Sequence, residues 1–175
     1  KPVEVTLASE FRYCDPIVTD KTLALVISQS GETIDTLAAM REAKRLGARV
    51  LSIVNVVGST IARESDDVLY TWAGPEIAVA TTKAYSTQLA LVYLIGLYCA
   101  RALETIRAAD YDAIVEELLL IPTKLEAILE NREDIQYFAS LYFNHPSIFF
   151  IGRNIDYAVG LEGSLKLKEI SYIHS

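Results

Sequence analysis

Two unbroken apolar runs with a helical pattern between them constrain the fold of this chain most strongly. The runs are "TLALVIS" at 22–28 and "RVLSIVN" at 49–55, and neither shows the alternation of a half-exposed strand. Continuous apolar strands are typical of parallel sheets whose faces are covered by helices. The stretch between them, "TIDTLAAMREAKRLG" at 33–47, has helical periodicity and ends at Gly47, a residue that often stops a helix. The pattern predicts parallel α/β structure with right-handed crossovers.

The same signals predict the remaining elements. Strands are expected at 3–7, 67–73 and 147–152, and helices at 59–66, from 83 to about 103, at 111–130, at 133–143 and at 157–174. The strand at 147–152 runs into a small polar turn and a helix, as the strand at 22–28 does. This similarity predicts two related α/β units, the first over residues 1–145 and the start of a second over 146–175.

The composition argues against several classes of protein. The net charge is −7, and Lys and Arg form no long run, so we expect neither a nucleic-acid surface nor a membrane surface. The apolar run at 89–100 is too short to span a bilayer and is expected to be a buried helix. Trp72 is expected to pack in or around the core, with its indole N–H at the edge. The cysteines and histidines form no metal-binding pattern, and free thiols suit the cytoplasm.

The polar turn "SQSGET" at 28–33 follows the first apolar run and opens a helix. Ligands of open parallel sheets bind beyond the carboxyl ends of the strands, where the next helix offers unpaired N–H groups. Four side chains of the turn add short, neutral hydrogen-bond donors: Ser28, Gln29, Ser30 and Thr33. Gly31 allows close approach of a ligand, and no Lys follows it as in a nucleotide P-loop. These features match a phosphate monoester.

A plain loop explains the same turn. Ser30 or Thr33 would then cap the helix, and Gly31 would ease the change of direction. Glu32 argues against a phosphate unless its carboxylate points away from the turn. The spacing of these residues leaves both interpretations open.

A second polar segment, "AVATTKAYSTQ" at 78–88, also leads into a helix. Thr81 and Thr82 could cap that helix, or they could face the same pocket as the first turn. Lys83 could add positive charge to the pocket or be solvated. An ordinary helix start remains an alternative here too.

The third cluster lies in "LEGSLKLKEISYIH" at 161–174. Lys166 and Glu169 are three residues apart on a helix and share a face, and Glu162 is four residues before Lys166. The three residues could form a surface ion-pair ladder. Alternatively, a Glu beside a Lys could act as a general base that moves a proton next to a carbonyl group.

Three motifs occur in one order, at 28–33, 74–90 and 161–174, and together they resemble the sugar isomerase (SIS) domain of the glutamine–fructose-6-phosphate aminotransferase family. These enzymes are also called glucosamine-6-phosphate synthases. "ASEFRY" at 8–13 and "SIVNVVGSTIARESD" at 52–66 fit as well, so the resemblance covers nearly the whole chain. It implies a three-layer, flavodoxin-like parallel sheet, with the first strand and helix of the first unit absent and the second unit cut short.

The resemblance also implies roles for individual residues. The phosphosugar is expected to bind to the serine/threonine turn, that is Ser28, Gln29, Ser30 and Thr33, with further contacts from Val79 and Thr81. Thr81 stands where serine is usual, a change that keeps the hydroxyl. Glu169 is expected to be the base that shuttles a proton between C1 and C2, and Lys166 to assist near the sugar hydroxyls.

The implied activity is the conversion of fructose 6-phosphate and glutamine-derived ammonia to glucosamine 6-phosphate, a step of hexosamine and cell-wall precursor synthesis. No cofactor is implied. The implied partners are a glutaminase domain in the parent chain and a second copy in a homodimer. The family's catalytic His loop and C-terminal lysine find no match here, and the chain starts at Lys1, so we expect a piece of a longer enzyme that is inactive alone.

Two other functions remain open from the residues. One is a stand-alone sugar-phosphate isomerase or deaminase without a glutaminase domain. The other is a non-catalytic phosphosugar-sensing module, in which no base is needed. The pairing of Glu169 with Lys166 favours an enzyme over a sensor.

Overall fold

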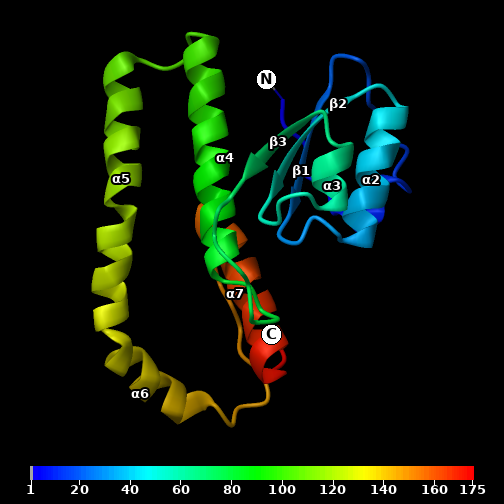
Figure 1. Cartoon of the computed structure of the whole chain (residues 1–175). Coiled ribbons are helices and arrows are strands. Elements are labelled where there is room, and N and C mark those ends of the chain that lie inside the picture. The colour runs from blue at the N-terminus through cyan, green and yellow to red at the C-terminus, as the bar shows by residue number, and fades with distance from the viewer. Residues whose placement is uncertain (1) are drawn as a thin grey trace. The chain divides into compact units, whose positions relative to one another are not determined.

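A computed structural model describes residues 2–175, and it contains one parallel sheet (Figure 1). Strands β1 (Leu23–Ser28), β2 (Arg49–Val54) and β3 (Asp67–Tyr70) pair in the order β1-β2-β3. In this register Ser28 pairs with Val54, and Val54 pairs with Tyr70. All three strands therefore end at one edge of the sheet. The predicted α/β class with a parallel sheet is confirmed.

Helices α2 (Ile34–Arg45) and α3 (Thr60–Glu64) connect the strands, and Gly47 follows α2 with a φ of 99°, as predicted for a helix stop. The other helices are α1 (Ala8–Phe11), α4 (Lys83–Ala102), α5 (Ala108–Glu130), α6 (Arg132–Tyr142) and α7 (Ile155–Ser171). Among the described residues, every helix is too short or too polar to cross a membrane.

The chain divides into two compact units. The first consists of residues 1–77 and 81–96, and the second of residues 78–80 and 97–175. The sheet with α1, α2 and α3 belongs to the first unit, and α5, α6 and α7 belong to the second. The boundary near residue 145 that the sequence suggested stays a prediction.

The core of the first unit lies between the sheet and helices α2 and α3. Its buried members are Met40, Val50, Val54, Ile61 and Ala62. β2 is buried along most of its length because it is the central strand. β1 instead alternates, and its side chains at Leu23, Leu25 and Ile27 are 53%, 39% and 42% exposed.

Two predicted strands do not form within the described residues. Residues 3–7 belong to no strand, and Val5 is 92% exposed. Residues 147–152 make only one isolated parallel bridge, between Ser147 and His174. A strand needs a neighbouring strand to pair its backbone N–H and C=O groups, and the sheet offers none to either segment. Both predictions were wrong because apolar sequence indicates the capacity for burial, not the presence of a pairing partner.

The apolar run at 89–100 forms part of α4, but its predicted burial is wrong. Leu97 is buried, whereas Leu94 is 49% exposed and Tyr98 is 75% exposed. A helix that is apolar all round can be fully buried only when neighbours cover every face. Trp72, predicted to pack in or around the core, is 76% exposed in the structure, so this prediction is wrong.

Candidate functional site

The polar turn at the end of β1 is held by its own hydroxyl groups. Ser28 Oγ accepts a hydrogen bond from the Gly31 N–H (3.1 Å) and lies 3.0 Å from Thr33 Oγ1. Ser30 Oγ accepts from the Glu32 N–H at 3.1 Å. Ser30 thus acts as an acceptor and has its O–H proton left to donate, whereas one of the two hydroxyl protons of Ser28 and Thr33 is used in the bond between them. The turn therefore gathers hydroxyl donors at the sheet edge where ligands bind in open α/β folds.

The first turn of α2 receives no cap from a side chain. Thr33 occupies the N-cap position with extended backbone, but its hydroxyl makes no capping bond and lies next to Ser28 instead. Ser30 also does not cap, since its oxygen accepts from Glu32, one residue before the N-cap. The plain-loop interpretation required one of these caps. Without them the N–H groups and positive dipole end of this helix are available to an anion.

Gly31 brings the turn into direct contact with the loop before α3. Its φ is 66°, and a Cβ at this position would lie 2.0 Å from Ser59 Oγ. The Gly31 carbonyl accepts a hydrogen bond from the Ile61 N–H (3.0 Å). Ser59 is the N-cap residue of α3, but its buried hydroxyl makes no capping bond. Only glycine fits here, because both the backbone conformation and the close approach exclude a side chain.

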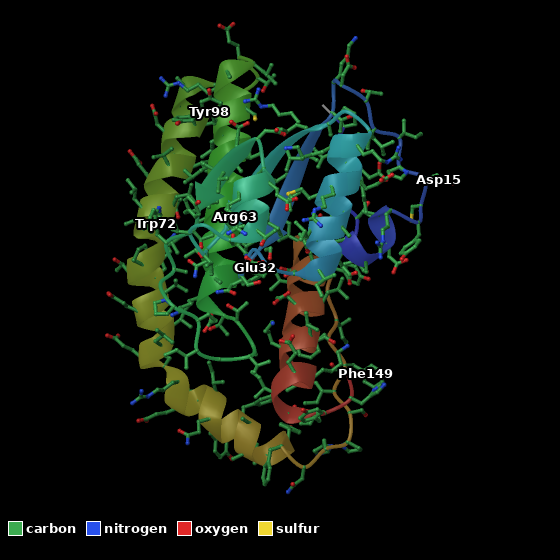
Figure 2. All side chains as sticks on the ribbon, turned by 45° about the vertical axis from the view of Figure 1, so that its right-hand side comes forward. Asp15, Glu32, Arg63, Trp72, Tyr98 and Phe149 are labelled. Atoms are coloured by element: carbon green, nitrogen blue, oxygen red, sulfur yellow. The ribbon has the colours of Figure 1, made fainter. Side chains whose placement is uncertain are left out.

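Glu32 points toward α3. Its Oε1 accepts from the Thr60 N–H at 2.7 Å, the first free N–H of α3. Figure 2 labels Glu32 together with Arg63 of α3. Hydrogen bonds from the Thr60 backbone and side chain lower the pKa of the Glu32 carboxyl, and the charge of Arg63 adds to this effect. The carboxylate that argued against a phosphate is therefore engaged at the neighbouring helix.

The predicted sugar-contacting residues lie on the segment between β3 and α4. Thr81 is half-buried, and its hydroxyl donates to Glu76 Oε2 at 2.5 Å. Lys83 Nζ donates to the Pro75 carbonyl at 2.5 Å. Val79 is 98% exposed. The structure thus gathers the serines and threonine of the 28–33 turn, and it describes Val79 as a surface residue.

On α7, Lys166 lies between two carboxylates, as the spacing predicted. Its Nζ is 2.5 Å from Glu169 Oε2 and 3.6 Å from Glu162 Oε1. The hydrogen bond to Glu169 raises the pKa of Lys166, against the opposing effect of desolvation. Lys166 is thus held as an ammonium ion, and the carboxylate is the group of this pair that can accept a proton. Lys168 points elsewhere, to the Ser175 carbonyl (3.3 Å).

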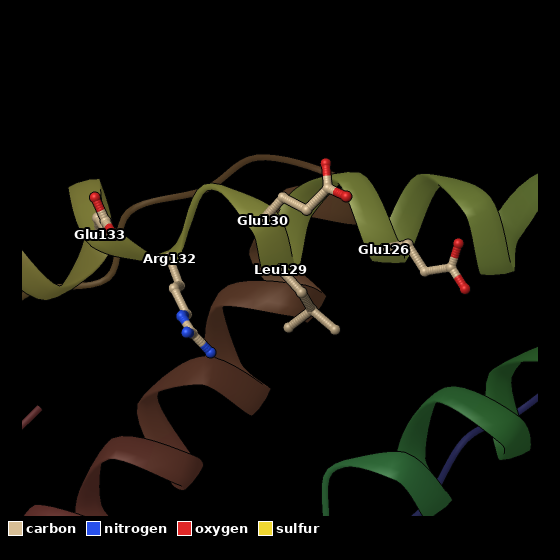
Figure 3. Close-up of a pocket in the computed structure, with 5 residues that line it drawn as sticks. All are labelled: Glu126, Leu129, Glu130, Arg132 and Glu133. Carbon is tan, nitrogen blue, oxygen red and sulfur yellow. The ribbon is translucent and has the colours of Figure 1, made fainter.

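A surface hollow of about 500 Å³ lies at the junction of α5 and α6 (Figure 3). Its lining residues are Glu126, Leu129, Glu130, Arg132 and Glu133. Three carboxylates against one guanidinium disfavour an anionic ligand. Within residues 2–175, no cluster of His, Cys, Asp or Glu side chains could hold a metal ion. The hollow is therefore not a candidate phosphosugar site.

No role was predicted for Asn55, which lies at the centre of the sheet edge where the three strands end. Asn55 follows β2 directly, and its N–H donates to the Gln29 carbonyl at 3.0 Å. Its side chain forms hydrogen bonds with the segment after β3. The sequence contains a signal for Asn55, because this polar residue ends the second apolar run just as Gln29 follows the first. Aligning the two strand ends would have identified it.

The SIS domain family matches residues 1–98 of this chain. The glutamine–fructose-6-phosphate aminotransferase (isomerizing) of Clostridium acetobutylicum is 58% identical over 174 residues, and that of Caldanaerobacter subterraneus subsp. tengcongensis is 60% identical over 174 residues. Each alignment covers 99% of this chain, and the chain spans 29% of the length of each relative.

A solved structure is similar over the same extent. The C-terminal domain of glucosamine-fructose-6-phosphate aminotransferase from Francisella tularensis has a TM-score of 0.95 and 39% sequence identity. The match covers 99% of this chain and 49% of that chain.

Replacing Gly31 by Ala tests the close approach between the turn and the α3 loop. We expect Gly31→Ala to lower the free energy of unfolding by about 2–5 kcal/mol, since it adds steric overlap to the cost of a left-handed alanine. Gly58→Ala is the matched control, because Gly58 has a φ of 73° and open space around a Cβ. Urea denaturation followed by circular dichroism measures both, and equal losses would contradict the close approach.

The lowered pKa of Glu32 predicts a pH dependence of stability. The bond to Thr60 stabilises the fold fully above the pKa of the unfolded chain, and this contribution is lost as the pH falls through the lower folded pKa. Wild type should therefore have a higher urea midpoint than Glu32→Gln at pH 7, and the difference should shrink below about pH 4.5. A difference that grows on acidification would contradict the assignment.

Proposed function

The chain belongs to the SIS domain family, and from this premise we propose that it is the phosphosugar-binding isomerase part of a glutamine–fructose-6-phosphate aminotransferase. Identity of 58% and 60% with enzymes of that name supports the proposal. The observation that carries it is the 28–33 turn, where Ser30 accepts a backbone N–H and keeps its proton for an anion, and the hydrogen-bonded Ser28–Thr33 hydroxyl pair has one further proton to donate. The activity is formation of glucosamine 6-phosphate from fructose 6-phosphate and glutamine-derived ammonia.

In this proposal the turn binds the phosphate group. The donors are Ser28, Gln29, Ser30, Thr33 and the first N–H groups of α2. Short neutral donors can hold a phosphate without a basic side chain, because a helix N-terminus and hydroxyls together satisfy its oxygens. Val79 and Thr81 contact the sugar portion. A chain with a net charge of −7 can bind this anion because the contacts are local.

The chemistry that we propose needs one base. Ammonia condenses with the C2 ketone of the open-chain sugar, and water leaves to give an imine. Glu169 removes a proton from C1, the C1–C2 double bond forms, and the C2–N π electrons move to nitrogen, which is protonated. A proton then returns to C2 while the C1 hydroxyl becomes the aldehyde. Lys166, held as an ammonium ion, stabilises negative charge on a sugar oxygen.

The wider organisation follows from the same proposal. The parent protein carries a glutaminase domain, acts in the cytoplasm and forms a homodimer. Residues 1–145 belong to a first SIS unit, and residues 146–175 begin a second. The Lys166–Glu169 pair supports catalysis over a purely phosphosugar-sensing role, because binding alone requires no base there.

Ser30→Ala tests the phosphate role of the turn. Loss of one hydrogen bond to a charged oxygen should weaken binding of glucosamine 6-phosphate by about 1.5–3 kcal/mol, or roughly 10- to 150-fold. Isothermal titration of wild type and variant measures the change. Affinities within twofold of each other would remove Ser30 from the site.

Glu169→Gln tests the base. In a chimera in which this chain replaces the matching segment of the Clostridium acetobutylicum enzyme, we expect the variant to bind glucosamine 6-phosphate and to lose turnover. Glu162→Gln is the matched control, because Glu162 also flanks Lys166 on α7. Formation of glucosamine 6-phosphate, followed by a coupled assay, should persist in the control. Equal turnover in the two variants would reject Glu169 as the base.

A further inference from the structure

Three residues directly after the strands form one row across the sheet edge. Gln29 follows β1, Asn55 follows β2 and Thr71 follows β3. The Asn55 N–H donates to the Gln29 carbonyl (3.0 Å), and the Thr71 N–H donates to the Val54 carbonyl (3.0 Å). Sheet-like bonding therefore continues one residue beyond the strands, and Asn55 is the central residue of this row.

The side chain of Asn55 forms hydrogen bonds with the start of the segment between β3 and α4. Its Oδ1 accepts from Thr71 Oγ1 (2.8 Å) and from the Ala73 N–H (2.9 Å), and its Nδ2 donates to the Gly74 carbonyl (2.7 Å). Both acceptor sites of the amide oxygen are thus used. One side chain fixes three of the first four residues of this segment.

The bonded residues surround a backbone conformation that needs support. Trp72 has a φ of 53° and Gly74 a φ of 74°. A left-handed tryptophan is uncommon and persists only where its surroundings determine the conformation. Trp72 touches the ring of Tyr70 (centroids 5.7 Å apart) yet is 76% exposed, so burial of the indole does not supply this support. The bonds from Asn55 on both sides of Trp72 do.

The residues after Gly74 also form hydrogen bonds, and one of these reaches the predicted sugar contact. The next residue, Pro75, accepts from Lys83 Nζ, and Glu76 accepts from the Thr81 hydroxyl. Along the chain, the residues that Asn55 holds are therefore followed directly by Pro75 and Glu76, and Glu76 is hydrogen-bonded to Thr81. The backbone N–H of Asn55 donates to Gln29 in the 28–33 turn.

We propose that Asn55 is a positioning residue that holds the segment after β3 in register with the 28–33 turn, and that it thereby sets the preference for a phosphosugar over free phosphate. The inference rests on the proposed function, since it assumes phosphate at the turn and sugar at Thr81. Free phosphate needs only the turn. A phosphosugar also needs the segment that Asn55 holds.

The test is titration of the 175-residue chain with inorganic phosphate and with glucosamine 6-phosphate. For Asn55→Ala we expect glucosamine 6-phosphate to bind about tenfold or more weakly, and inorganic phosphate to bind within about twofold of wild type. Thr71→Val, which removes one of the three bonds, should give an intermediate loss and serves if Asn55→Ala does not fold. Asn131→Ala is the matched control, because Asn131 donates to the Ala127 carbonyl on α5.

A second readout needs no ligand. Trp72 is the one tryptophan of the chain, so its fluorescence anisotropy reports on the held segment directly. Release of the segment should lower the anisotropy in Asn55→Ala and leave it unchanged in Asn131→Ala. This separates the mechanical part of the proposal from ligand binding.

If Asn55→Ala lowers the affinity for both ligands equally, Asn55 contributes only general stability and the inference is overturned. Unchanged affinities for both ligands, or an unchanged anisotropy of Trp72, would also overturn it. If wild type binds neither compound, the proposed function fails, and the specificity role of Asn55 fails with it. Binding of both compounds by wild type, with selective loss of glucosamine 6-phosphate in the variant, supports the inference.

Discussion

The polar residues that follow the three strands lie at one edge of the sheet, and this placement depends on the parallel register of the strands. Because Ser28, Val54 and Tyr70 lie side by side, the loops after them begin at one level. Backbone groups leaving the sheet must find partners, and here they find them in one another. The same register brings the first turn against the loop before α3, where no side chain larger than glycine's hydrogen fits at residue 31.

At this edge of the sheet, the groups that can donate to an anion are neutral, and the charged side chains have other partners. The donors in the 28–33 turn are hydroxyls and backbone N–H groups, while the nearby charged side chains are engaged elsewhere. Glu32 accepts from the Thr60 N–H at the start of α3, and Lys83 donates to the Pro75 carbonyl. On α7, the hydrogen bond to Glu169 holds Lys166 protonated. In the proposed function, the turn and the α7 pair have separate roles, which are phosphate binding and proton transfer.

Local pattern was enough to predict the sheet, its parallel class and the polar turn. The continuous apolar runs at 22–28 and 49–55 form β1 and β2, and β2 is buried along most of its length, although one face of β1 is exposed. Pairing was not predictable in the same way. The segments at 3–7 and 147–152 are as apolar as true strands, yet no neighbour pairs with them in the sheet.

For the candidate site, the sequence predicts residues but not their geometry. The sequence identified Ser28, Ser30 and Thr33, but only the structure shows that Thr33 turns toward Ser28 and leaves α2 without a side-chain cap. The direction of Glu32 and the bonds of Asn55 depend on contacts between loops 16 to 28 residues apart in the sequence. Spacing within one segment carries no information about such contacts.

The central claim is that the 28–33 turn binds the phosphate group of a phosphosugar. Calorimetric titration of the 175-residue chain with glucosamine 6-phosphate, with free glucosamine as the control, tests it most directly. The account predicts saturable binding of the phosphate ester and none of the free sugar. Equal binding of the two compounds, or no binding by a chain that circular dichroism shows to be folded, would contradict it.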